Sequence, residues 1–178
     1  MARIPYRKPW FIVTAVIVVA GLGVALYLFQ PWLLFVDKTV DEKLPEAQST
    51  SQESDDEDTK STPEGPVDVA SGDFVSQEHT TSGEARLVKN ADGSHVLAIE
   101  GLDTSNGPDL RVWLTDQKVD ADEWFVFDDG YYVELGELKG NKGDQVYEVP
   151  DDVDLDKVTS VSVWCKRFSV SFGAAELT

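Results

Sequence analysis

Hydrophobic residues follow two different patterns along this chain. From Trp10 to Val36 the run WFIVTAVIVVAGLGVALYLFQPWLLFV contains no charged residue. As a helix, its first part, residues 10–29, would be about 30 Å long, enough to cross the hydrocarbon of a bilayer. We therefore predict a transmembrane anchor over residues 10–36.

The charges beside this anchor predict its orientation. Arg3, Arg7 and Lys8 precede it, and the sequence after it begins with Asp37 and becomes strongly acidic. Because positive residues tend to stay in the cytoplasm, we expect a single-pass protein of the cell membrane, with residues 1–9 cytoplasmic and the C-terminal domain extracytoplasmic. A signal peptide cleaved after Val18-Val19-Ala20 is the alternative, but it would leave an apolar N-terminus on the mature protein.

No hydrophobic periodicity is visible in residues 37–69. This segment carries 11 acidic and 3 basic side chains, and its centre reads QSTSQESDDEDTKSTPEGP. Such a composition cannot bury enough apolar surface to offset the conformational entropy of ordering. We therefore predict a disordered acidic linker that spaces the next domain from the membrane.

Residues 70–178 show the period-two alternation of β-strands. EARLVK and HVLAIE flank the turn NADGS, which predicts a hairpin, and DLRVWLT, YYVEL, QVYEVP, SVSVWC and FSVSF have strand character. YYVEL is expected to return through QVYEVP after a glycine-rich turn. About seven to eight short strands without a long helix predict an all-β domain, an antiparallel β-sandwich.

The predicted domain is acidic. Residues 70–178 carry 22 acidic and 9 basic side chains. Because this charge repels phosphate backbones and anionic lipid headgroups, it argues against nucleic acid as a partner. The expected partners are the membrane, through residues 10–36, and an unidentified envelope protein or redox partner.

Cys165 is the only cysteine in the chain. It shares strand parity with Val161 and Val163, which places the thiol on the apolar face as a small hydrophobe with a raised pKa. Lys166 and Arg167 follow it, but the next residue along a strand points the other way. Because no second cysteine exists, thiol exchange would need another molecule.

The segments WCKRFSVSFGAAEL, HTTSGEARL and GLDTSNGPDLRVWLTD resemble the DM13 domain, over about residues 74–177. The resemblance implies a role in electron transfer or redox reactions, with Cys165 as the redox or haem-binding residue. A second haem ligand would have to be His79, expected at the surface, or His95, expected at the rim of the core. Covalent c-type haem attachment is excluded because no Cys-x-x-Cys-His motif occurs.

Two tryptophans point away from the predicted core face. Trp113 alternates with Leu114, and Trp164 alternates with Cys165. Exposed together, the two rings would form a surface for recognition of a partner. The alternative is cross-strand packing on the second face of the sheet.

Catalytic motifs are missing from the sequence. It has no Gly-x-Ser-x-Gly elbow and no cluster of His and Cys spaced for a metal. We predict a membrane-anchored DM13-like domain with an electron-transfer or thiol redox role centred on Cys165. The alternative is a non-catalytic binding or adhesion module of the cell envelope, in which Cys165 is only a packed core residue.

Overall fold

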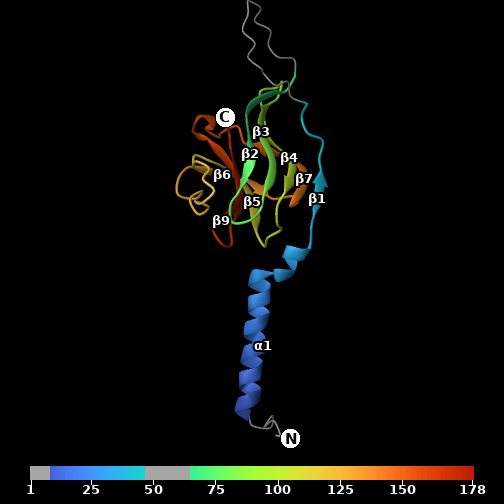
Figure 1. Ribbon diagram of the computed structural model, residues 1–178, viewed down its shortest axis with the longest axis vertical. Helices are drawn as coiled ribbons and strands as arrows, with labels where there is room; N and C mark the ends of the chain where they lie inside the picture. Colours follow the sequence, from blue (N-terminus) through green and yellow to red (C-terminus); the bar gives the residue numbers. More distant parts are fainter. Residues whose placement is uncertain (1–8, 47–64) are drawn as a thin grey trace, which may run out of the picture.

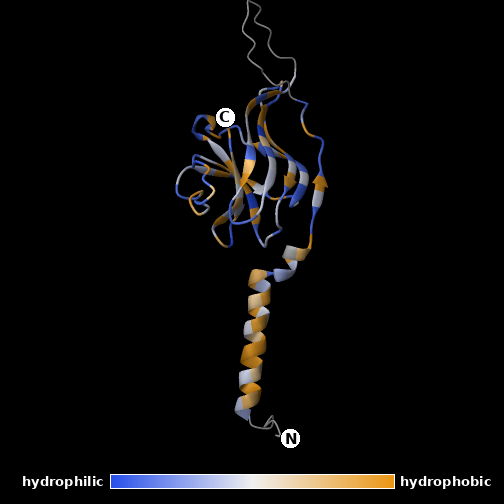
Figure 2. Cartoon of the chain, viewed as in Figure 1, coloured by the Kyte–Doolittle hydropathy of each residue, from blue (hydrophilic) through white to orange (hydrophobic). Residues whose placement is uncertain are grey.

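One apolar helix precedes the folded domain. The computed structural model describes residues 9–46 and 65–178. Helix α1 (Pro9–Phe29) has 21 residues and is long and apolar enough to cross a membrane. Figure 2 shows its apolar character along most of its length. Of the expected cytoplasmic segment 1–9, all but Pro9 lies outside the described residues.

The helix ends before the predicted end of the anchor. Gln30 has a left-handed backbone with φ 42°, and the short 3-10 helix η1 (Pro31–Phe35) follows it. Pro31 has no N–H with which to continue the helix, and it disfavours helical geometry in the residue before it. The predicted anchor over residues 10–36 is therefore divided into α1 and η1.

The domain is built on a nine-stranded sheet with the order β1-β7-β4-β3-β2-β9-β8-β5-β6 (Figure 1). Among the strands of the described residues, only β1 and β7 pair in parallel. The strands are β1 (Thr39–Asp41), β2 (Val67–Ser76), β3 (Ser82–Lys89), β4 (His95–Asp103), β5 (Leu110–Thr115), β6 (Tyr132–Glu137), β7 (Lys142–Val149), β8 (Ser160–Cys165) and β9 (Val170–Glu176), with a 3-10 turn η2 (Leu155–Lys157) before β8. The all-β prediction is confirmed.

Strand β2 joins the two halves of the sheet. Residues 67–73 pair with β3, and residues 74–76 pair with β9. The sheet curls at this strand, and its two halves enclose one apolar core. Inward-facing residues such as Leu97 of β4 and Val163 of β8 are completely buried, as the period-two alternation predicted.

The connections between strands differ in one respect from the prediction. β3 and β4 form the expected hairpin, in which Gly93 has φ 90°. YYVEL and QVYEVP do not form a hairpin, because β6 pairs with β5 whereas β7 lies between β1 and β4. The turn over residues 138–141 instead carries the chain from one half of the sheet to the other.

The segment after η1 is part of the sheet. The prediction of a disordered linker over residues 37–69 is wrong for residues 39–41, which form β1 on the edge of β7, and for residues 67–69, which begin β2. Residues 47–64 lie outside the described residues. Residues 39–41 have no apolar pattern of their own, and pairing with β7 holds them in the sheet. Composition therefore could not predict this strand.

Candidate functional site

Cys165 lies at the end of β8, between two other strands. Its cross-strand neighbours are Leu110 of β5 and Val170 of β9. The residue has no exposed surface and belongs to the main apolar core. Burial raises the pKa of the Cys165 thiol, although the backbone amides of Phe168 and Arg167 act in the opposite direction. A neutral, buried thiol cannot reach a disulfide of another protein in this conformation.

The surroundings of Cys165 do not fit haem ligation. An axial thiolate needs a deprotonated sulfur and space for the iron beside it. Here burial favours the protonated thiol, and the core packs around the residue so that none of its surface is exposed. The haem role that the resemblance implies for Cys165 would therefore require a different packing of β8.

Trp113 and Trp164 are buried. Their residues are 3% and 1% exposed, and their rings stack with centroids 5.0 Å apart. Phe127, from the connection between β5 and β6, is completely buried beside Trp164. The hypothesis of an exposed recognition surface is therefore wrong, because alternation tells which face a side chain takes but not whether another segment covers that face.

Tyr132 extends the two tryptophans to the surface. Its ring lies nearly parallel to that of Trp113, with centroids 4.2 Å apart and an interplanar angle of 8°. Tyr132 is 44% exposed. The rings of Tyr132, Trp113 and Trp164, called the aromatic stack below, thus run from solvent to the residue that precedes Cys165.

The middle ring of the stack has an unpaired donor. Within the described part of the chain, the buried indole nitrogen Nε1 of Trp113 has no hydrogen-bond partner. A buried donor without a partner is rare in folded proteins. Among residues 9–46 and 65–178, no side-chain oxygen is therefore placed to take the indole proton of Trp113.

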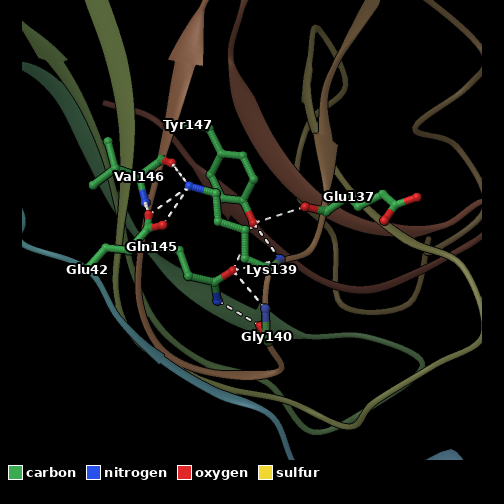
Figure 3. Close-up of polar contacts among 7 residues, drawn as sticks. All are labelled: Glu42, Glu137, Lys139, Gly140, Gln145, Val146 and Tyr147. Atoms are coloured by element: carbon green, nitrogen blue, oxygen red, sulfur yellow. Dashed lines mark hydrogen bonds and ion pairs between the residues drawn. The ribbon is translucent and has the colours of Figure 1, made fainter.

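A buried polar cluster lies in the other half of the sheet, on β7 (Figure 3). Gln145 is completely buried. Its side-chain oxygen accepts hydrogen bonds from the backbone N–H groups of Lys139 and Gly140, at 3.1 and 3.2 Å, and from the Tyr147 hydroxyl at 2.8 Å. Its amide group donates to the Gly140 carbonyl at 2.7 Å. Because burial raises the pKa of Tyr147 to about 12, the hydroxyl keeps its proton at neutral pH.

Residues beside this cluster fasten the segment that follows η1 to the domain. Lys139 Nζ donates to both carboxylate oxygens of Glu42, at 2.9 and 2.7 Å, and the Val146 N–H donates to this carboxylate at 2.8 Å (Figure 3). These hydrogen bonds, that of Lys139 first, lower the pKa of Glu42. Asn141 Oδ1 accepts from the Lys38 N–H at 2.7 Å. The polar cluster therefore has a structural role: Gln145 holds the turn at residues 139–140, and this turn carries the side chains that bind the segment around β1.

The end of α1 contacts the turn that follows Cys165. Arg167 donates to the Leu28 carbonyl at 2.8 Å. Phe168 stacks on Phe29 with centroids 5.7 Å apart. The last carbonyls of a helix lack partners within the helix, so the arginine satisfies one of them. The turn that follows Cys165 therefore lies against the end of α1, and Figure 1 shows the helix leaving the domain at one end.

The two histidines lie in different places. His79 is half-buried, and its ring lies on that of Phe172 with centroids 3.8 Å apart. Burial lowers the pKa of His79, which favours the neutral imidazole at neutral pH. His95 begins β4 and lines an open hollow beside β7.

Sequence reasoning missed Tyr132 and Gln145. Both carried a usable signal in their parity. The pattern placed Val133 toward the core. Its neighbour Tyr132 therefore points to the opposite face of the sheet, which is the face that Trp113 takes. Gln145 shares the parity of the inward residues Tyr147 and Val149, and a polar side chain at such a position indicates a buried hydrogen-bonding role.

Comparison with known protein families covers this domain from within β2 onward. Residues 73–177 match the family DM13, described as Electron transfer DM13. No curated protein and no solved structure matches the chain. Because the matched residues run from within β2 to the end of β9 and make up more than half of the 178 residues, the chain belongs to the DM13 family.

Proposed function

We propose that this chain is a single-pass membrane protein that transfers electrons one at a time on the outer side of a cell membrane. The apolar α1 serves as its anchor. Arg3, Arg7 and Lys8 favour the cytoplasmic side for the residues that precede α1, which leaves the DM13 domain extracytoplasmic. Cys165 and the aromatic stack form the electron path.

The aromatic stack is the observation that carries this proposal. Thiol exchange requires direct contact between two sulfur atoms, and the buried Cys165 offers none. Electron transfer requires only short distances between groups that can be oxidised. The stack offers such a series from the exposed Tyr132 to Trp164, with centroid separations of 4.2 and 5.0 Å, and Trp164 is joined to Cys165 by a peptide bond.

The electron balance of the path is simple. A one-electron acceptor protein at the surface removes one electron from the stack and leaves one radical cation. A one-electron donor at the Cys165 end returns the electron and restores the neutral rings. Because Trp113 Nε1 has no hydrogen-bond acceptor in the described part of the chain, the indole keeps its proton and the oxidation reverses without proton transfer.

Flash photolysis of the full chain in nanodiscs tests this proposal. A photogenerated ruthenium(III) polypyridyl ion serves as a soluble oxidant, and transient absorption and electron paramagnetic resonance detect the radicals. The test uses a background with Trp10→Phe and Trp32→Phe, because these two tryptophans are 63% and 49% exposed and would be oxidised directly. In this background we expect a tryptophan radical that is lost in Trp113→Phe but kept in Trp124→Phe. Trp124 is a matched control because its ring contacts Phe125 instead of the stack. An equal radical yield in both variants would contradict the proposal.

The alternative function is an envelope binding or adhesion module in which Cys165 is only packed. The complete burial of Cys165 favours it. In the flash experiment, Cys165→Ala separates the two functions. If the cysteine belongs to the path, the lifetime of the tryptophan radical changes in this variant. An unchanged lifetime together with an unchanged melting temperature would make Cys165 a replaceable core residue.

A further inference from the structure

A cavity lies between the end of the apolar helix and the domain. Its volume is about 360 Å³, and its lining includes Phe29 and Leu33 on the helix side and Phe168, Val170, Phe172 and His79 on the domain side. This volume falls within the range of pockets that hold small molecules, about 300 to 1,000 Å³. We call it the membrane-side cavity.

Hydrogen bonds on two sides join the walls of the cavity. Arg167 ties its turn to the Leu28 carbonyl. On the other side, the side-chain nitrogen of Asn106 donates to the Val36 carbonyl at 3.1 Å. The walls from the helix and from the domain are therefore held together by direct hydrogen bonds, so a ligand meets a cavity that is already formed.

The position of the cavity indicates where its ligand comes from. The 21 residues of α1 rise about 1.5 Å each, a length close to the hydrocarbon thickness of a bilayer. The end of α1 at Phe29 therefore lies at the membrane surface when the helix spans it. A molecule with an apolar tail in the bilayer and a ring at headgroup level reaches this cavity directly.

The lining selects among such molecules. Aromatic rings from Phe29, Phe168 and Phe172 favour a flat ring, because offset stacking adds to the burial of apolar area. His79 contributes an imidazole to the lining. A neutral imidazole can donate a hydrogen bond to an oxygen on the ring of the ligand, or accept one from a hydroxyl there. An acyl chain needs neither feature.

Charge argues against the common anionic lipids. Glu78 also lines the cavity and is exposed, and the domain around it is strongly acidic. The guanidinium of Arg167, which lies nearby, already donates to helix carbonyls. A phosphate group would therefore be repelled, whereas an uncharged ring would not.

We propose that the membrane-side cavity binds the ring of a membrane quinone or quinol, with His79 hydrogen-bonded to a ring oxygen. The inference rests on the electron-transfer function proposed above and names the class of donor at the Cys165 end. A bound quinol gives one electron to the oxidised stack and one proton to the neutral imidazole of His79, and it is left as a semiquinone radical. Val170 supports this placement, because it lines the cavity and is the cross-strand partner of Cys165. One residue thus separates the bound ring from the thiol.

Photoaffinity labelling of the full chain in phosphatidylcholine nanodiscs tests the proposal. An azido-quinone is photolysed with the protein, decylubiquinone competes with it, and mass spectrometry maps the labelled peptides. We expect saturable labelling of the segments that contain Phe168 or His79. His79→Phe keeps a ring on Phe172 but removes the hydrogen bond, so half-competition should require about tenfold more decylubiquinone.

His95→Phe is the matched control, since His95 lies outside the cavity, and it should compete like the unaltered protein. The proposal is overturned if labelling does not saturate, if it maps elsewhere, or if His79→Phe and His95→Phe compete equally. It is also overturned if phosphatidylglycerol competes as well as decylubiquinone.

The two proposals fail separately. If the flash experiment gives a tryptophan radical but the azido-quinone does not label the cavity, the electron path is supported and the quinone site is rejected. If the azido-quinone labels the cavity but no tryptophan radical forms, the quinone site is supported and the electron path is rejected.

Discussion

The thiol of Cys165 should be strongly protected from labelling in the native protein. The residue has no exposed surface and lies on β8, with β5 and β9 on either side. A reagent can reach the sulfur only after these strands separate. Because they form the centre of their half of the sheet, the opening free energy should approach that of global unfolding, about 5 to 15 kcal/mol for a domain of this kind.

The size of the protection follows from this opening. Each 1.4 kcal/mol corresponds to about a factor of ten, so an opening cost of about 5 kcal/mol slows labelling more than about a thousandfold relative to the unfolded chain. Burial also raises the pKa of the thiol, which lowers the fraction of reactive thiolate at neutral pH.

Labelling with a maleimide in detergent, with and without guanidinium chloride, measures this protection. Cys165→Ala gives the background, because the chain has one cysteine. Native labelling within about tenfold of the denatured rate would refute the reasoning, since it would mean an opening cost below about 1.4 kcal/mol. Such a result would return thiol exchange to consideration as the chemistry of Cys165.

The raised thiol pKa also predicts how stability depends on pH. A group that holds its proton more tightly in the folded state makes the unfolded state the more deprotonated one as pH rises. The contribution of Cys165 is therefore fully present below the ordinary thiol pKa, about 8.5, and is lost as pH rises above it. Cys165→Ala should lose less stability than the unaltered protein over this alkaline range, as measured by urea unfolding.

Two further predictions concern the polar cluster and the attachment of β1. Gln145→Leu leaves the buried N–H and C=O of Gly140 without partners. At about 1 to 3 kcal/mol for each group, the variant should lower the free energy of unfolding, measured by urea titration, by about 2 to 6 kcal/mol. A loss below about 1 kcal/mol would contradict the role of the cluster. Gly143→Ala should detach β1, because a Cβ at this position collides with the Val40 carbonyl. Proteolysis after Lys43 should therefore increase in this variant. It should not increase in the control Gly93→Ala, because Gly93 has a φ of 90°, close to the 92° of Gly143, but open space for a Cβ.

Local pattern was sufficient for much of this protein. The uncharged run after Trp10 predicted the apolar helix, and alternation predicted the β domain and the apolar face of Cys165. These features follow from the repeat of the helix and the strand, which each segment carries within its own residues.

Contacts between distant segments determined the rest. The connection that carries Phe127 covers Trp113 and Trp164, a strand of three residues joins β7, and the turn after Cys165 meets the end of α1. No periodicity contains this information, because a pattern defines the faces of a segment and not what packs against them. The aromatic stack and the membrane-side cavity both arise where residues far apart in the chain meet, and only the folded domain brings them together.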